Sequence, residues 1–203
     1  MADQLVTTAQ VKTRLGITDV TDDALISELI DQCTDWIQDR TKRKLVPEPA
    51  ATYVVDTSAG SVIEVHRGIR VVTSLGIAST DQPDTGGSYT AVTAADILLR
   101  PLAIDRRPGW PATQILLKGS SVGRLAAVLN GAQIVGDFGF ASVPPSIAAV
   151  ALDAVATAYT SRQSGDSDVA GPDGSPIAVW ARLFAPGTVQ RQTIDRYTLP
   201  GIG

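Results

Sequence analysis

The sequence predicts an α+β fold, in which a helical core carries an inserted, mostly antiparallel β subdomain and an extended C-terminal tail. Residues 7–40 and 145–162 repeat apolar side chains at helical spacing. Residues 50–143 instead hold short β-branched or aliphatic runs separated by Gly, Pro, Asp and Ser. From residue 187 on, the apolar content is too low for the chain to fold alone.

Residues 7–15 are predicted to form a short first helix. Thr7 and Gln10 have the spacing of a capping box, in which each side chain bonds the other residue's backbone N–H. Gly16 favours a helix end at this point, since glycine adopts the left-handed conformation there.

A second helix is predicted over residues 22–40. Thr21 is the expected N-cap, with Asp22 and Asp23 placed where the positive helix end favours anions. Pro47 prevents much continuation. The apolar side chains form one stripe that faces a core: Leu25, Ile26, Leu29, Ile30, Cys33, Trp36 and Ile37.

The end of this helix carries the densest run of positive charge, Arg40, Lys42, Arg43 and Lys44. Cations at a helix C-terminus complement the helix dipole, and this explanation needs no partner. The same four residues are candidate contacts to DNA or to an acidic partner surface, and both roles can coexist.

The middle of the chain is predicted to be a β subdomain made of short strands. Turn-forming residues separate the runs, so neighbouring strands are expected to pair antiparallel. The predicted strands are Thr52 to Val55, Val62 to Val65, Ile69 to Val72, Leu75 to Ala78, Ile97 to Leu99, Ile115 to Leu117 and Ile134 to Phe138.

A third helix is predicted over residues 145–162, because Pro145 suits the first helical turn. It has few charges on any face, so its own domain or a neighbouring subunit must cover it. A short helix should follow from Ile177 to Phe184. The side chains expected to pack the core or a neighbouring subunit are Ile147, Val150, Ala154, Ala158 and Tyr159.

These predictions divide the chain into four parts. Residues 1–46 are an N-terminal helical hairpin, and residues 47–143 are the β-rich subdomain. Residues 144–186 complete the helical core with the long helix, a loop and the short helix, and residues 187–203 are the extended tail.

Composition excludes several classes of protein. A net charge of −4 argues against a general nucleic-acid binder, although a local basic patch remains compatible with it. The single cysteine, Cys33, permits no intramolecular disulfide. The N-terminus lacks the basic start and apolar run of a signal peptide, and no apolar stretch approaches the roughly 20 residues of a membrane span, so no membrane partner is expected.

The sequence holds little catalytic chemistry. His66 is the only histidine, no Gly-x-Ser-x-Gly nucleophile motif is present, and one Cys with one His makes a zinc site implausible. The sequence contains neither Gly-x-x-x-x-Gly-Lys-Ser/Thr nor Gly-x-Gly-x-x-Gly, the two glycine motifs that bind nucleotide phosphates. We therefore expect no catalytic residue, no metal and no cofactor; the competing hypothesis is a small enzyme that uses His66 as its base.

A further alternative is a DNA-binding regulator that uses the first two helices as a helix-turn-helix. Residues 22–40 would then be the recognition helix. Asp22, Asp23 and Glu28 in its first turns would face phosphates unfavourably, which weakens this interpretation.

The order of these elements resembles the head-tail connector, or adaptor, family of tailed phages. Leu5 to Ile17, followed by Asp22 to Ile26 and Trp36 to Arg43, is similar to the opening helical hairpin of that family. Phe138 to Phe140, with Val143 to Ile147 and Tyr159 to Arg162, resembles its junction between a strand and the long helix. Val189 to Tyr197 loosely resembles its extended tail. The long central β region is larger than in compact all-helical members.

The resemblance implies a structural, non-enzymatic protein in the virion neck, assembled in the host cytoplasm. Its copies would form a ring, expected to be a dodecamer, between the portal protein and a stopper or tail-completion protein. DNA would pass through the ring without sequence-specific contacts. The tail residues expected to dock onto the portal or a neighbouring subunit are Arg191, Ile194, Arg196, Tyr197 and Leu199.

Overall fold

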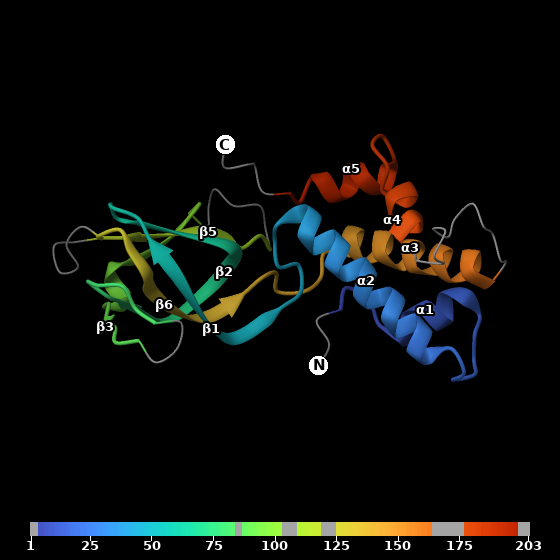
Figure 1. The fold of residues 1–203 in the computed structure, drawn as a ribbon, viewed down its shortest axis with the longest axis horizontal. Coiled ribbons are helices and arrows are strands. Elements are labelled where there is room, and N and C mark those ends of the chain that lie inside the picture. Colours follow the sequence, from blue (N-terminus) through green and yellow to red (C-terminus); the bar gives the residue numbers. More distant parts are fainter. Residues whose placement is uncertain (1–3, 84–86, 103–108, 119–124, 164–176, 199–203) are drawn as a thin grey trace. The chain divides into compact units, whose positions relative to one another are not determined.

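The computed structural model describes residues 4–83, 87–102, 109–118, 125–163 and 177–198. The chain forms two compact units, one made of residues 1–46 and 143–203 and the other of residues 47–142 (Figure 1). The α-helices belong to the first unit, called the helical unit, and the strands to the second, called the β unit. The α+β fold class is confirmed; the division into four parts stays a prediction.

The helical unit begins as the sequence predicts. Thr7 and Gln10 form the capping box of α1, and Gly16 ends the helix with a left-handed φ of 72°. The α-helices among the described residues are α1 (Thr8–Leu15), α2 (Asp23–Thr41), α3 (Pro145–Gln163), α4 (Ile177–Leu183) and α5 (Val189–Asp195).

The start of α2 differs from the prediction. Asp22, not Thr21, is the N-cap, and its side chain makes no capping hydrogen bond. The Thr21 backbone N–H instead donates to Asp19 Oδ1 at 3.0 Å, which fixes the turn between α1 and α2. The Asp19 carboxylate accepts this bond, and its pKa is lowered as a result.

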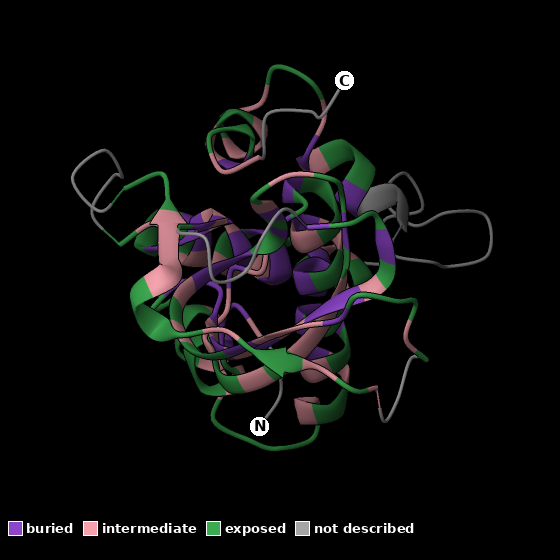
Figure 2. Ribbon diagram, turned by 90° about the vertical axis from the view of Figure 1, so that its left-hand side faces the viewer, coloured by how far each residue is buried: buried purple, intermediate pink, exposed green. Residues whose placement is uncertain are grey.

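The long helix α3 lies at the centre of the helical unit. It contacts α1, α2, α4 and α5, so helices of the same unit cover its apolar face. Ile147, Ala154, Ala158 and Tyr159 are buried, whereas Val150 is half-buried. Figure 2 colours the ribbon by burial, with buried residues in purple. Tyr159 also donates from its hydroxyl to Asp22 Oδ2 at 2.6 Å, which links α3 to the start of α2.

The sequence predicts an extended tail over residues 187–203, but part of this segment is helical. Thr188 caps α5 by accepting the Arg191 N–H at 3.2 Å, and the helix runs over Val189–Asp195. Ile194 is 0% exposed, so α5 is held by the core of the helical unit. The segment has few apolar residues, yet α5 can form because one buried side chain packs into a core that the other helices supply.

In the part of the β unit that the structure describes, six strands form one sheet, and their pairs are all antiparallel, as predicted. The strand order is β1-β6-β2-β5-β4. The short strand β3 is not in this order and pairs with the end of β2. The strands are β1 (Glu48–Thr57), β2 (Val62–Ile77), β3 (Thr90–Ala91), β4 (Ile97–Arg100), β5 (Ala112–Leu117) and β6 (Val128–Phe138), and a 3-10 turn, η1 (Ala94–Asp96), precedes β4.

Three of the predicted short strands are one long strand, β2. Its beginning, residues 62–64, pairs with β5, and residues 69–77 pair with β6. Gly68 lies between these stretches with φ +81°, and a Cβ there would lie 2.6 Å from Cγ of Pro111. Glycine therefore bends the strand here without ending it.

One side of the sheet encloses the apolar core of the β unit. Because side chains alternate along a strand, buried residues recur at every second position over residues 132–138 of β6 and at Ile63 and Val65 of β2. The core contains Ile63, Val65, Ile69, Leu75, Ala112, Ile115, Leu117, Leu125, Ala132, Ile134 and Phe138.

Candidate assembly interface

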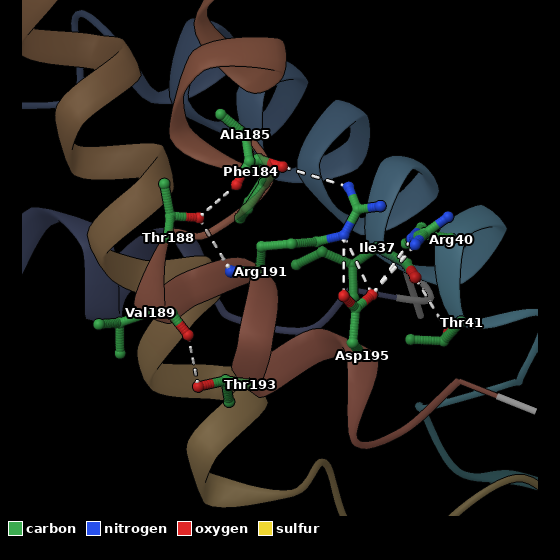
Figure 3. Close-up of polar contacts among 10 residues, drawn as sticks. All are labelled: Ile37, Arg40, Thr41, Phe184, Ala185, Thr188, Val189, Arg191, Thr193 and Asp195. Carbon is green, nitrogen blue, oxygen red and sulfur yellow. Dashed lines mark hydrogen bonds and ion pairs between the residues drawn. The ribbon is translucent and has the colours of Figure 1, made fainter.

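The best-defined polar cluster among the predicted site residues joins α5 to α2 (Figure 3). Arg191 Nε donates to both carboxylate oxygens of Asp195, at 3.0 and 3.1 Å, and Arg191 Nη1 donates to the Phe184 carbonyl at 3.2 Å. On α2, the Arg40 guanidinium lies 3.3 Å from the same Asp195 carboxylate. Asp195 is thus shared by two cations from different helices.

Aromatic side chains lie next to this cluster. The rings of Trp36 on α2 and Phe184, the residue after α4, stack with centroids 4.3 Å apart. The Arg191 guanidinium lies 6.0 Å from the Trp36 ring centroid, at the outer limit of a cation–π contact. Arg191 therefore connects α5 both to α2 and to the segment that follows α4.

These contacts separate the predicted tail residues into internal and external ones. Ile194 is buried, Arg191 is half-buried in the cluster, and the Tyr197 hydroxyl lies 2.9 Å from Ser146 Oγ at the start of α3. Arg196 is exposed, whereas Leu199 lies outside the described residues.

The outward side of α5 presents a small mixed surface. Val189 is 74% exposed, and Gln192 and Arg196 are also exposed. These three residues lie three and four positions apart, which places them on one face of the helix, opposite Ile194. We call Val189, Gln192 and Arg196 the outer face of α5; it combines an apolar, an amide and a cationic side chain available to a partner.

The predicted basic run does not form one positive patch. Arg40 pairs with Asp195, and Lys42 Nζ lies 2.5 Å from Asp39 Oδ1. Arg43 is only 8% exposed, and its burial lowers the pKa of its guanidinium. Lys44 is half-buried. Two of these cations are neutralised by carboxylates and a third is inside the protein, so the run offers DNA little free charge.

The only histidine of the sequence, His66, lies in the β unit. His66 is exposed on β2 beside Arg67, whose Nη1 donates to the Tyr53 hydroxyl at 3.0 Å. That hydroxyl donates in turn to Glu48 Oε1 at 2.5 Å. Burial, and then the Glu48 hydrogen bond, raise the pKa of Tyr53 to about 12. Tyr53 is therefore a neutral hydrogen-bonding group at physiological pH.

Among the described residues, no group of three or more His, Cys, Asp or Glu side chains is placed to hold a metal ion. None of the helices described has both the length and the apolar character to cross a membrane.

Sequence reasoning missed that α5 packs back on α2. The local signals were present, since Thr188 stands three residues before Arg191 and Arg191 stands four before Asp195. The first spacing indicates an N-cap, and the second an ion pair on one helix face. Neither signal specifies which other helix receives the apolar side of α5.

Comparison with known proteins points to one family. Residues 6–67 match the family described as phage gp6-like head-tail connector protein. The matched range covers α1, α2, β1 and the beginning of β2. No curated protein matches the chain in sequence.

Solved structures with a similar fold come from gene transfer agent (GTA) particles. A chain in the neck of an empty GTA particle with C6 symmetry is 20% identical, with a TM-score of 0.56, over 98% of this chain and 92% of that one. A chain in the virion of a native GTA particle is 19% identical, with the same TM-score of 0.56 and the same 98% and 92% coverage. A chain in the native neck with C12 symmetry is 20% identical, with a TM-score of 0.52, over 97% and 90%. At these identities the likeness shows a shared fold.

Proposed function

We propose that the chain, whose residues 6–67 match the family of phage gp6-like head-tail connector proteins, is a member of that family and a structural adaptor of the virion neck. The family match is the observation that carries the proposal. It falls on the helical hairpin, whose capping box and buried α2 stripe organise the helical unit. The protein would hold its place by packing and docking, with no catalytic step.

The partners are proposed as follows. Copies of this chain form a ring, a dodecamer in the simplest case, below the portal protein and above a stopper or tail-completion protein. DNA passes through this ring without sequence-specific contacts. The net charge of −4 supports this, because a channel that gripped the phosphates would hinder passage. The ring lies in the virion neck and is assembled in the host cytoplasm.

The contact between copies in a ring is heterologous, because the patch that each copy presents differs from the patch that receives it. We propose the outer face of α5 as one such patch, docking onto the portal or the neighbouring subunit. Val189 would supply the apolar contact and Arg196 the cationic one. Ile194, Arg191 and Tyr197 would serve this docking indirectly, by keeping α5 in place.

The α3 residues are proposed to stabilise the helical unit of each subunit in the ring. Ile147, Ala154, Ala158 and Tyr159 face other helices of the same unit and are buried, so a neighbouring copy would not reach them. Val150 is half-buried and is the one residue of this predicted set with surface left for a neighbour.

The experiment that tests the neck role is quantitative mass spectrometry of purified particles. The quantity measured is the number of copies of this chain per portal subunit. A ratio near one is expected for a neck ring. Absence of the chain from particles in which the portal is readily detected would overturn the proposal.

The docking surface needs a separate test with a matched control. Val189→Asp combined with Arg196→Glu should abolish incorporation into particles while the protein stays folded, because both side chains are exposed. Val20→Asp combined with Arg162→Glu makes the same kind of change elsewhere on the exposed surface of the helical unit and should leave incorporation unchanged. Equal incorporation of the two double variants would refute the role of α5.

A further inference from the structure

The exposed side of α2 carries a row of carboxylates. Its members recur three or four positions apart, so they lie on one face of the helix, opposite the buried stripe. All four side chains are exposed, and the row extends about 16 Å along the helix axis. We call Glu28, Asp31, Asp35 and Asp39 the acidic face of α2.

Most of this negative charge lacks a counter-charge. Asp39 pairs with Lys42, but among the described residues no Lys or Arg forms an ion pair with Glu28, Asp31 or Asp35. The side chains that donate to two of these three are neutral glutamine amides. Like charges three or four positions apart destabilise a helix. The acidic face therefore weakens α2 unless a cation from another chain approaches it.

Two exposed arginines of the helical unit also lack an ion-pair partner among the described residues. Arg182 lies in the last turn of α4, and Arg196 is the C-cap of α5. Each cation complements the negative end of its own helix, and its guanidinium still has donors for a partner. The neighbouring Phe184 and Asp195 contact α2, so both arginines belong to the side of the helical unit where α4 and α5 meet α2 (Figure 3).

The acidic face points away from this side of α2. Successive residues of a helix are about 100° apart, so the acidic face is centred roughly 120° from Trp36 and Arg40, which contact Phe184 and Asp195. The two charged surfaces of one copy therefore face different directions. In a ring, each subunit presents one surface to the neighbour on one side and a different surface to the neighbour on the other. This arrangement would bring the unlike charges of adjacent copies together.

We propose that the acidic face of α2 binds Arg182 and Arg196 of the adjacent copy in the ring. The proposal rests on the proposed ring function, and it identifies the surface onto which the outer face of α5 docks. Charge complementarity supports a second copy as the partner, because carboxylates repel the phosphates of DNA and both complementary surfaces belong to this chain. Arginine can also bind a carboxylate through two parallel hydrogen bonds, which would fix the orientation of the neighbour.

A third arginine provides a matched control. Arg162 is exposed near the end of α3 and likewise has no ion pair within the described residues. Its neighbours Tyr159 and Gln163 bond Asp22 at the beginning of α2, whereas α5 pairs with Arg40, about 27 Å further along that helix. Arg162 is therefore remote from the side that bears α5, and reversing its charge should leave the contact intact.

The first test reverses the charges of each surface separately and then of both. One variant carries Glu28→Lys and Asp35→Lys, a second carries Arg182→Glu and Arg196→Glu, and a third carries all four substitutions. Each single-surface variant should enter particles at least about tenfold less than wild type, because like charges then meet. The combined variant should recover to within about threefold of wild type, because the pairs re-form with opposite polarity. Incorporation of the combined variant as low as that of the single-surface variants would overturn the proposal.

Unfolding of the purified variants separates a lost contact from a lost fold. Glu28→Lys with Asp35→Lys replaces like-charge neighbours on α2 by attractive ones, so its thermal midpoint should equal or exceed that of wild type. A midpoint below wild type would show that these carboxylates serve the helix itself and would overturn the assignment. Val20→Asp with Arg162→Glu is the control and should enter particles as wild type does.

Disulfide cross-linking tests the contact between copies directly, in particles and with the concentrated purified chain. Asp35→Cys with Arg196→Cys in one chain should give a ladder of covalent multimers, because each copy joins both neighbours. Cys33 does not interfere, since burial raises the pKa of its thiol and limits access. Asp35→Cys with Arg162→Cys is the matched control and should give at least about tenfold fewer multimers, because its sulfur atoms would not meet. Equal yields would overturn the proposal.

Failure of this contact can be told apart from failure of the neck role. Wild-type chain at one copy per portal subunit, without rescue by the combined variant, would overturn the contact and leave the adaptor function standing. Multimers of the purified Asp35→Cys, Arg196→Cys chain, with the wild-type chain absent from particles, would support the contact and overturn the neck role.

Discussion

Replacing Ile194 with alanine should release α5 from the helical unit. Ile194 is 0% exposed, and truncating a buried isoleucine costs about 2–5 kcal/mol. The polar contacts of α5 offer little compensation, since partly exposed ion pairs such as Asp195 with Arg40 contribute about 0–1 kcal/mol. A helix of seven residues is not stable alone, so undocking and unfolding of α5 should coincide.

Hydrogen exchange at the amides of residues 189–195 measures this release. A loss of about 2–4 kcal/mol corresponds to exchange about 30- to 1,000-fold faster in α5, with α2 little changed. Val189→Ala is the matched control: its side chain is 74% exposed, so the substitution should change stability by less than about 0.5 kcal/mol. If exchange in α5 were the same in the two variants, the assignment of Ile194 as the anchor would be refuted.

Three further predictions concern charge, pH and backbone fit. Asp195→Asn should weaken α5 docking by no more than about 1 kcal/mol, and hydrogen exchange should show this difference vanish in about 1 M salt. Because the folded chain holds the Tyr53 phenolic proton more tightly than the unfolded chain, with a pKa raised to about 12, its contribution to stability is present below about pH 10 and is lost as the pH rises toward 12. Tyr53→Phe should remove this loss, which urea denaturation from pH 8 to 12 detects as a flatter pH dependence. Gly136→Ala should destabilise the β unit by at least about 2 kcal/mol in denaturant titration, since the new Cβ would lie 2.1 Å from the Val71 carbonyl oxygen.

Local sequence signals predicted the helices well. The capping box at Thr7, the left-handed end at Gly16 and the proline at the start of α3 act within one helical turn, so they can be read without knowing the fold. The long strand β2 was not predicted, because its continuity depends on β6 pairing along residues 69–77. A glycine such as Gly68 has the same local signature whether the strand ends there or bends.

The contacts at the candidate interface were harder to predict from the sequence. Arg43 and Arg40 look alike in the sequence, yet one is buried and the other pairs with a residue 155 positions away. Likewise, the sequence allows Ile194 to contact a partner, whereas in the structure its side chain is buried in the helical unit. Contacts of this range depend on packing between helices far apart in the chain.

The β unit is inserted between α2 and α3, and this affects the order in which the chain can fold. During synthesis α2 leaves the ribosome about a hundred residues before α3, which covers its apolar stripe. At about 5–20 residues per second, the stripe stays uncovered for about 5–20 s. The β unit is contiguous and can fold within that interval. The helical unit can fold only after its second half is made, so the nascent chain exposes an apolar stripe that α3 covers in the folded unit.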